Sequence, residues 1–259
     1  MESAAVPGNI TVNTVGVDAP FRWLAGAWRD LGKAPGPCLA YGLALALVSI
    51  AGSAMFIASN AAFWVLALSC GFVLIAPVLA MGLYEAGREI EQGQKPTLAR
   101  MIFVRAAVRQ DVAYLGVALL MIYLLWGRIA QVVYGLSTYS YHTTIESFVT
   151  FALFTVDGWS MLATGTLVGG VIAFFTFCLV VVSAPMLLDH KANVWSATAA
   201  SFTAVATNPG PMLLWAALIV VLLLISAATA FLGLIVIFPW LGLASWRAYR
   251  DLVRVPAPA

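Results

Sequence analysis

Histidine is the residue type on which most metal and redox sites within membranes depend, and this chain has only two, His142 and His190. The first lies in a polar segment and the second at the end of a distant apolar run, so we expect them not to share one metal. His142 and Glu146 are four residues apart, which would place two ligands on one helix face. Two ligands do not close a metal site. A solvated surface pair is therefore the better interpretation.

Cysteine offers no further chemistry. Cys38, Cys70 and Cys178 occur singly within apolar runs, without the paired spacing of a metal site or a disulfide framework. Buried cysteines of this kind behave as small apolar residues. We find no glycine-rich phosphate loop and no pairing of a nucleophile with a base, so we expect no enzyme activity, no metal and no cofactor.

Arg128 is the sharpest candidate for a functional polar residue, because an ionisable side chain inside a membrane span is costly. Gln131 follows it by about one helical turn. Two interpretations are open. Arg128 could belong to a site within the membrane, or it could extend to the outer interface from the last turns of its helix, paired with Glu146 or Asp157. We favour the second interpretation.

A group of charged residues follows the second apolar run and recurs at the end of the chain. The first group is Glu85, Arg88, Glu89 and Glu91, and the second is Arg247, Arg250 and Asp251. A network between them could lock the two regions together or line a path for a solute. Because interfacial ion pairs are usually structural, locking is favoured.

Gly165 and Gly169 form a pair of small residues four positions apart. Such pairs let two membrane helices approach closely. The approach could be within the chain or with another chain. We therefore expect a membrane-protein partner or a homo-oligomer.

Composition places these residues in a bilayer. Hydrophobic residues make up 63% of the 259 residues and charged residues 9%, which is too little polar surface for a soluble globule. The runs 38–58, 61–84, 112–134 and 162–188 each suffice for the roughly 20 residues that cross a membrane. The run 212–246 would be about 50 Å long as one helix, against a hydrocarbon core of about 30 Å. We therefore expect two helices joined near Ala228, and six transmembrane helices in three hairpins.

The basic residues predict the orientation of these hairpins. With six spans, Arg128 is the one basic residue that falls on the outer side. By the positive-inside rule both termini are then cytoplasmic, in the bacterial inner membrane. The basic side would contact anionic lipid headgroups. A net charge of +2 gives no indication of nucleic-acid binding.

Two stretches of the chain share one pattern. Residues at matching spacings precede Pro35-Gly36-Pro37 and Pro209-Gly210-Pro211. They are Phe21, Leu24, Trp28 and Leu31 in the first stretch, and Trp195, Thr198, Phe202 and Val205 in the second. The expected unit is an interfacial amphipathic helix followed by a membrane hairpin, at 18–91, 96–188 and 192–253, although the middle unit lacks Pro-Gly-Pro. Since every unit starts and ends on the same side, the internal repeat would be parallel.

The opposite faces of these amphipathic helices differ. Arg22, Arg29 and Lys33 make the first one basic, which is typical of a helix in the headgroup plane. In the last one small residues take their place: Ala197, Ala200, Ser201 and Ala204. Small residues predict close packing against protein. The middle unit should begin with a helix over 96–111.

The expected domain organisation is simple. Residues 18–253 form a single membrane domain between a disordered tail at 1–17 and a short tail at 254–259. The last hairpin is shorter than the first, by about 9 Å for each helix at roughly 1.5 Å per residue. Segment 135–160 has apolar residues at helical spacing, and we expect it to cap the short hairpin near Ala228.

Several motifs together resemble a bacterial family of predicted integral membrane proteins of unknown function (domain of unknown function 2189), over about residues 17–253. They are Asp18-Ala19-Pro20-Phe21-Arg22-Trp23, Trp28-Arg29-Asp30-Leu31, Gly82-Leu83-Tyr84-Glu85, Pro185-Met186-Leu187-Leu188-Asp189, Asn208-Pro209 and Tyr249-Arg250-Asp251-Leu252. The resemblance implies an inner-membrane protein with six helices. Some members carry a label that links them to cytochrome c oxidase subunit I. A haem–copper core needs several histidines within the membrane, and neither histidine here is expected at mid-span.

Two functions from different classes fit these observations. The favoured one is a non-catalytic accessory, assembly or scaffold subunit of an inner-membrane complex, such as a respiratory complex. The alternative is a transporter or channel for a small solute, which the internal repeat and Arg128 would suit. Solute paths usually need polar groups near the midplane, and the apolar runs contain few of them.

Overall fold

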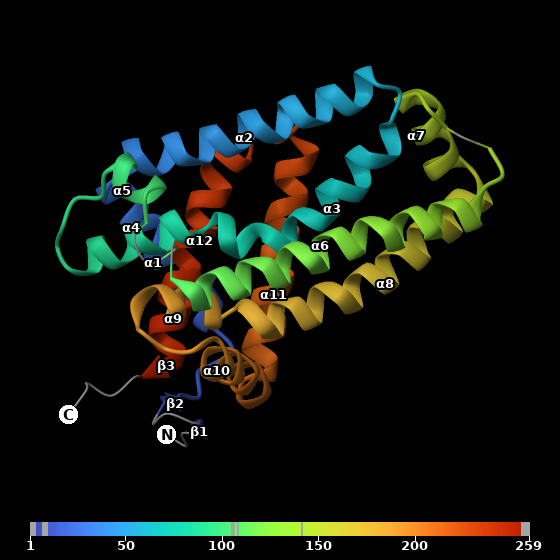
Figure 1. Cartoon of the computed structure of the whole chain (residues 1–259). Helices are drawn as coiled ribbons and strands as arrows, with labels where there is room; N and C mark the ends of the chain where they lie inside the picture. Colours follow the sequence, from blue (N-terminus) through green and yellow to red (C-terminus); the bar gives the residue numbers. More distant parts are fainter. Residues whose placement is uncertain (1–3, 7–9, 105–106, 108, 141, 255–259) are drawn as a thin grey trace.

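A computed structural model describes residues 4–6, 10–104, 107, 109–140 and 142–254 (Figure 1). The elements are, in chain order, β1 (Ala4–Val6), β2 (Ile10–Val12), α1 (Ala19–Lys33), α2 (Pro35–Ala58), α3 (Ala62–Leu79), α4 (Met81–Glu91), α5 (Leu98–Ile102), α6 (Gln110–Ser137), α7 (Ile145–Phe154), α8 (Val156–Val180), α9 (Ser183–Asp189), α10 (Val194–Thr207), α11 (Pro209–Ala228), α12 (Leu234–Leu252) and β3 (Val253–Arg254). The described chain is thus almost entirely helical.

Four long helices, α2, α3, α6 and α8, run alongside one another, and α11 and α12 cross them steeply (Figure 1). The molecule therefore has two distinct ends. We call the end with α1, α4, α5, α9, α10 and the described termini the network end. The opposite end, where α7 joins α6 to α8, is the α7 end (Figure 1).

The apolar helices make the chain a membrane protein. By length and composition, five helical stretches of the described residues could cross a bilayer: α2, α3, α6, the stretch Val156–Asp189 and α11. Few residues of α2 and α11 are buried in the single chain, as expected of helices that contact lipid. The helix α12 does not count among the five, and its last two turns carry Arg247, Arg250 and Asp251.

The long apolar run near the C-terminus is divided where the sequence predicts. The first helix, α11, ends at Ala228, and α12 begins at Leu234. Between them Ala230 and Phe231 have left-handed backbone, with φ of 51° and 67°. This conformation is uncommon without glycine, and it reverses the chain within a few residues.

Pro-Gly-Pro opens a long helix in both places where it occurs. The helix α1 ends at Lys33 and α2 begins at Pro35, and α10 ends at Thr207 and α11 begins at Pro209. Proline suits the first turn of a helix, because its missing N–H would have no partner there. The small face of α10 is fully buried, which confirms the predicted packing against protein: Ala197, Ala200, Ser201 and Ala204.

The helix α1 is more deeply embedded than the sequence predicts. It packs along α12 and buries Trp23, Ala27 and Asp30. Phe21 and Trp28, expected on the apolar face with Leu24 and Leu31, remain exposed. The spacing of apolar residues predicted the helix, but it could not show that α12 also covers the face of α1 that contains Asp30.

Three expectations about segments outside the long helices are wrong. The expected disordered tail includes residues 10–17, yet β2 pairs with β3 in antiparallel register, with Thr11 opposite Arg254 and Val12 opposite Val253. Residues 1–3, 7–9 and 255–259 of the two expected tails lie outside the described residues. The expected helix over 96–111 is limited to the five residues of α5, and α6 begins at Gln110.

The third correction concerns α7. It packs on α8 and α3, where Phe148, Phe151 and Ala152 form a small buried cluster with Tyr134 and Met161. It therefore closes the far end of the four-helix layer, and it does not cap the short hairpin near Ala228. The main core lies at the network end, around α12.

Candidate functional site

The last two turns of α12 are the centre of a polar network. Arg247 pairs with Asp30 of α1, with 2.5 Å between Nε and Oδ2, and Lys33 pairs with the other oxygen of Asp30 at 2.9 Å. Asp30 is only 6% exposed. Burial acts to raise the pKa of Asp30, but the hydrogen bonds from Arg247 and Lys33 outweigh it and hold the pKa below its ordinary value.

Arg250 joins α12 to two further elements. Its Nε lies 3.0 Å from Oε1 of Glu91 at the end of α4, and its Nη1 lies 3.5 Å from Oδ2 of Asp189 at the end of α9. Two other side chains of α12 contact the same two acids. Trp246 donates through Nε1 to Glu91 at 3.1 Å, and the hydroxyl of Tyr249 donates to Asp189 at 2.9 Å. Three helices that are distant in sequence, α4, α9 and α12, are thereby held together.

Asp251 connects α12 to the N-terminal segment. Its carboxylate accepts a hydrogen bond from Nε1 of Trp23 at 2.9 Å and lies 3.8 Å from Nη2 of Arg22. Its backbone oxygen accepts from Nδ2 of Asn13 at 2.9 Å. One residue thus contacts both α1 and the segment that follows β2.

The predicted charged residues lie at the network end, but not all of them connect α4 to α12. Glu85 and Arg88 pair with each other inside α4, at 2.5 Å, and the link to α12 is made by Glu91 at the end of α4. Glu89, also buried, pairs with Arg100 at 3.0 Å through Oε1, while its Oε2 has no hydrogen-bond partner among the described residues. Burial raises the pKa of the Glu89 carboxyl.

The central part of the chain matches a known family of membrane proteins. Residues 65–189, from within α3 to the end of α9, match the family described as Predicted integral membrane protein (DUF2189). Over these residues the family predicted from the motifs is confirmed, whereas the motifs at 18–31, 208–209 and 249–252 lie outside the match. No curated protein and no solved structure matches the chain.

The DUF2189 match divides the network. The matched segment supplies Glu91 and Asp189, whereas Arg250 and Asp30 lie in the flanking parts. The ion pairs of Arg250 with Glu91 and Asp189 therefore attach the C-terminal flank to the matched segment, and the pair of Asp30 with Arg247 joins the two flanks.

Arg128 lies on α6 far from this network. It is exposed, and Oε1 of Gln131 lies 3.3 Å from its Nη1. Among the described residues neither Glu146 nor Asp157 forms an ion pair with it. At about 1.5 Å per residue, Arg128 stands roughly 25 Å along α6 from Asp111, near the far side of a hydrocarbon core of about 30 Å.

The two glycines of the predicted pair have different surroundings. A Cβ on Gly169 would lie 2.8 Å from Cη2 of Trp126 on α6, so this glycine permits contact between α8 and α6. A Cβ on Gly165 would meet no described atom within 4 Å. Trp126 also donates through Nε1 to the carbonyl of Ala67 on α3 at 2.7 Å. The tryptophan thus joins three helices of the layer.

The histidines do not come together. His142 stacks on Phe151, with 4.3 Å between ring centroids, and its Nδ1 lies 3.2 Å from the hydroxyl of Tyr134. His190 lies at the network end, where Nε2 is 3.2 Å from Asp189. Within the described ranges no three metal-binding side chains form a group.

Several network residues escaped the sequence analysis. They are Asp30, Asp189, Trp246 and Tyr249. One signal could have identified Asp30: it lies between Ala27 and Leu31, both buried, so an acid stands on a helix face that is otherwise apolar. Such an acid needs a basic partner, and the basic residues near the chain end could supply one.

Proposed function

We propose that this chain is a non-catalytic accessory, assembly or scaffold subunit of a bacterial inner-membrane complex, such as a respiratory complex. In the proposed topology six helices cross the membrane as three hairpins of a parallel repeat, with α12 as the sixth. Both termini are cytoplasmic, and the network end contacts anionic headgroups. In support, the Lys and Arg residues in the described part of the chain lie at the network end, apart from Arg128 (Figure 1).

The observation that carries this proposal is that charged side chains at the network end pair with one another. Acids of α1, α4 and α9 are each paired with an arginine of α12. Such pairing holds helices in place, and it leaves these groups poorly suited to bind and release a solute. Polar side chains within the spans form hydrogen bonds inside their own helices. Thr176 and Ser226 donate to backbone carbonyls one turn earlier, at 2.8 and 3.1 Å.

A groove on the outer surface of α8 offers a place for a partner helix. Its volume is about 430 Å³, and it is lined by Thr166, Leu167, Gly170, Val171, Phe174 and Phe175. A Cβ on Gly170 would meet no described atom within 4 Å, so the groove is open at this position. Grooves with small residues allow close approach of a second membrane helix.

Extraction in a gentle detergent, followed by mass spectrometry of co-purifying proteins, tests this function. We expect a membrane protein in constant ratio to the chain, or a homo-oligomer. Gly170→Leu should reduce this association several-fold. Gly52→Leu is the matched control, because Gly52 is also open and lies on α2. A chain that purifies alone and monomeric, with both variants unchanged, would contradict the proposal.

Transport of a small solute is the second candidate. It is favoured by helix interruptions at the network end, between α3 and α4 at Ala80 and between α8 and α9 at Val181 and Val182. Interrupted helices expose backbone groups that can bind solutes. Reconstituted vesicles would then show solute flux that Arg128→Ala abolishes. Normal insertion and function of this variant would remove the case for a site at Arg128.

A further inference from the structure

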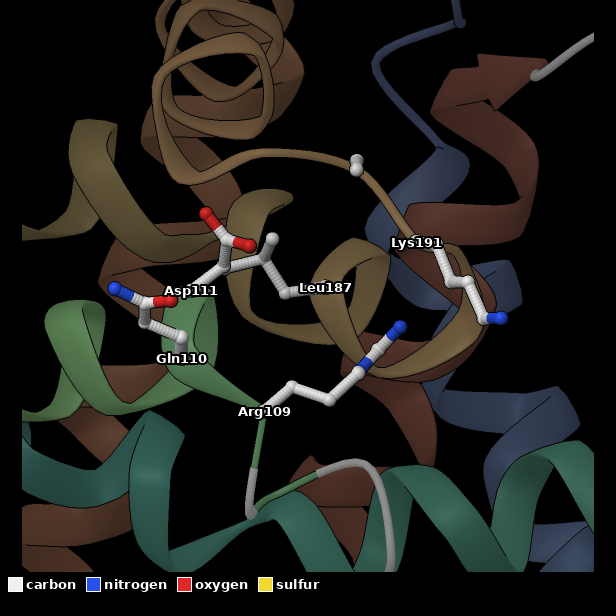
Figure 2. A pocket seen from close by; sticks show the side chains of 6 residues that line it. Arg109, Gln110, Asp111, Leu187 and Lys191 are labelled. Carbon is white, nitrogen blue, oxygen red and sulfur yellow. The ribbon is translucent and has the colours of Figure 1, made fainter.

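A small cavity opens at the network end, between the start of α6 and the segment that joins α9 to α10 (Figure 2). Its volume is about 270 Å³. The lining residues are Arg109, Gln110, Asp111, Leu187, Lys191 and Ala192. None of them belongs to the ion pairs on α12.

The charged side chains of this cavity differ in how firmly they are held. Arg109 donates to the carbonyls of His190 and Leu188, at 2.9 and 3.2 Å, so its guanidinium is fixed at the wall. Lys191 is exposed and has no ion-pair partner in the described part of the chain. Asp111 accepts a hydrogen bond from the backbone N–H of Val194 through Oδ1 at 2.9 Å.

Figure 2 shows how the charges are arranged. The carboxylate of Asp111 lies on one side of Leu187, and Lys191 lies on the other, with Arg109 below. The cavity therefore presents two positive groups and, across from Lys191, one negative group. A ligand that fits this arrangement needs a negative group and a positive group a few bonds apart.

The position of the cavity indicates the source of such a ligand. Tyr114 and Val117, about one and two turns further along α6, are exposed and begin its apolar lipid-facing surface. Trp195, at the start of α10 and four residues after Lys191, is 81% exposed. Exposed tyrosine and tryptophan side chains are typical of the membrane interface. The cavity thus lies at the level of lipid headgroups.

We propose that this cavity binds the phosphoethanolamine headgroup of a membrane phospholipid. The phosphate accepts hydrogen bonds from Lys191 and faces the fixed guanidinium of Arg109. The primary ammonium faces Asp111, whose Oδ2 is not used by Val194. A glycerol headgroup would leave this carboxylate without a cation, and the trimethylated ammonium of choline has no N–H to donate. The acyl chains lie along α6 beyond Tyr114.

Native mass spectrometry of the full chain in detergent tests this site. The protein is delipidated and offered phosphatidylethanolamine, phosphatidylglycerol and phosphatidylcholine in turn. We expect retention of phosphatidylethanolamine several-fold above the other two, and a loss of about tenfold in Lys191→Ala, equivalent to about 1.4 kcal/mol. Lys95→Ala is the matched control at the network end, and it should retain the lipid as wild type does.

A second variant removes the negative charge of Asp111 and keeps its hydrogen bond to Val194. Asp111→Asn retains an acceptor for Val194 N–H but removes the negative charge, so it should bind ethanolamine and glycerol headgroups equally. Soluble phosphoethanolamine is the probe for a free ligand. Equal retention of the three lipids by wild type, or unchanged retention in Lys191→Ala, would overturn the proposal. Binding of soluble phosphoethanolamine as tight as that of the lipid would overturn the membrane source.

Discussion

Asp30 is the residue whose partners matter most, because its buried carboxylate pairs with two cations. Loss of one partner from a buried pair leaves a desolvated charge behind. Asp30→Asn should lower the free energy of unfolding by about 1–3 kcal/mol, since Arg247 is itself partly exposed. Thermal unfolding of the purified protein in detergent measures this loss.

The double variant Asp30→Asn with Arg247→Gln provides the control. If the pair interacts directly, the double variant should lose less stability than the sum of the single variants. Lys33→Met should have a small effect, because the lysine is largely exposed. Additive losses would mean that the pair between α1 and α12 contributes little.

Two buried acids at the network end should respond to pH in opposite ways. The pKa of Asp30 is lowered from 3.8, so its contribution is present above that value and is lost as the pH falls through the folded pKa. The pKa of Glu89 is raised above 4.5, so the folded state binds the extra proton. Wild type should therefore lose stability as the pH rises from 4.5 through the folded pKa of Glu89. The charge of Arg100 lowers this pKa and the charge of Glu85 raises it, but burial has the largest effect.

Unfolding followed as a function of pH separates the two acids. Glu89→Gln should remove the loss above pH 4.5, and Asp30→Asn should remove the loss at acid pH. Each variant serves as the control for the other, because both acids are buried at the same end of the molecule. A Glu89→Gln profile parallel to that of wild type would contradict this expectation.

At the scale of elements, contact between α6 and α8 depends on one glycine. A Cβ on Gly169 would clash with the ring of Trp126, at 2.8 Å from Cη2 and 2.9 Å from Cζ3. Gly169→Ala should destabilise the protein by about 1–3 kcal/mol through overpacking. Gly165→Ala is the matched control, and it should be neutral or gain up to about 1 kcal/mol. Unfolding in detergent measures both, and equal effects would contradict the packing role of Gly169.

The sequence predicted those elements whose signals are local. The buried small face of α10 and the division of the last apolar run at Ala228 were both predicted from spacing and length. The strand β2 was not predicted, because a three-residue strand carries no local signal when Thr11 and Val12 pair with residues at the opposite end of the chain. The length of α5 was overestimated, since helical spacing cannot reveal that the following residues leave the helix.

The candidate site was predicted in composition but not in pairing. Charged residues were expected to form a network where α4 and α12 end, and Glu91 and Arg250 do pair there, whereas Glu85 pairs with Arg88 of its own helix. Which acid of α4 meets an arginine of α12 depends on how the two helices pack, and one sequence does not show this. The role of Asp189 was also missed, because its partners lie some 60 residues away in the chain.

For the whole molecule, the number of crossings decides the orientation. If α12 crosses the membrane, a fluorescent protein fused after the last residue should be cytoplasmic and fluorescent, and a phosphatase at that position should be inactive. A phosphatase inserted near Thr138, at the α7 end, should be active in the periplasm. An active phosphatase at the C-terminus would mean an odd number of crossings and would overturn the proposed topology.

The pairing of α1 with α12 has a consequence for biogenesis. During translation α1 leaves the ribosome well before α12, because Arg247 follows Asp30 by 217 residues. Until α12 has been made, Asp30 has Lys33 of its own helix as a partner but lacks Arg247. A nascent protein truncated before α12 would keep this acid exposed, which would give quality-control proteases a means to recognise an unfinished copy.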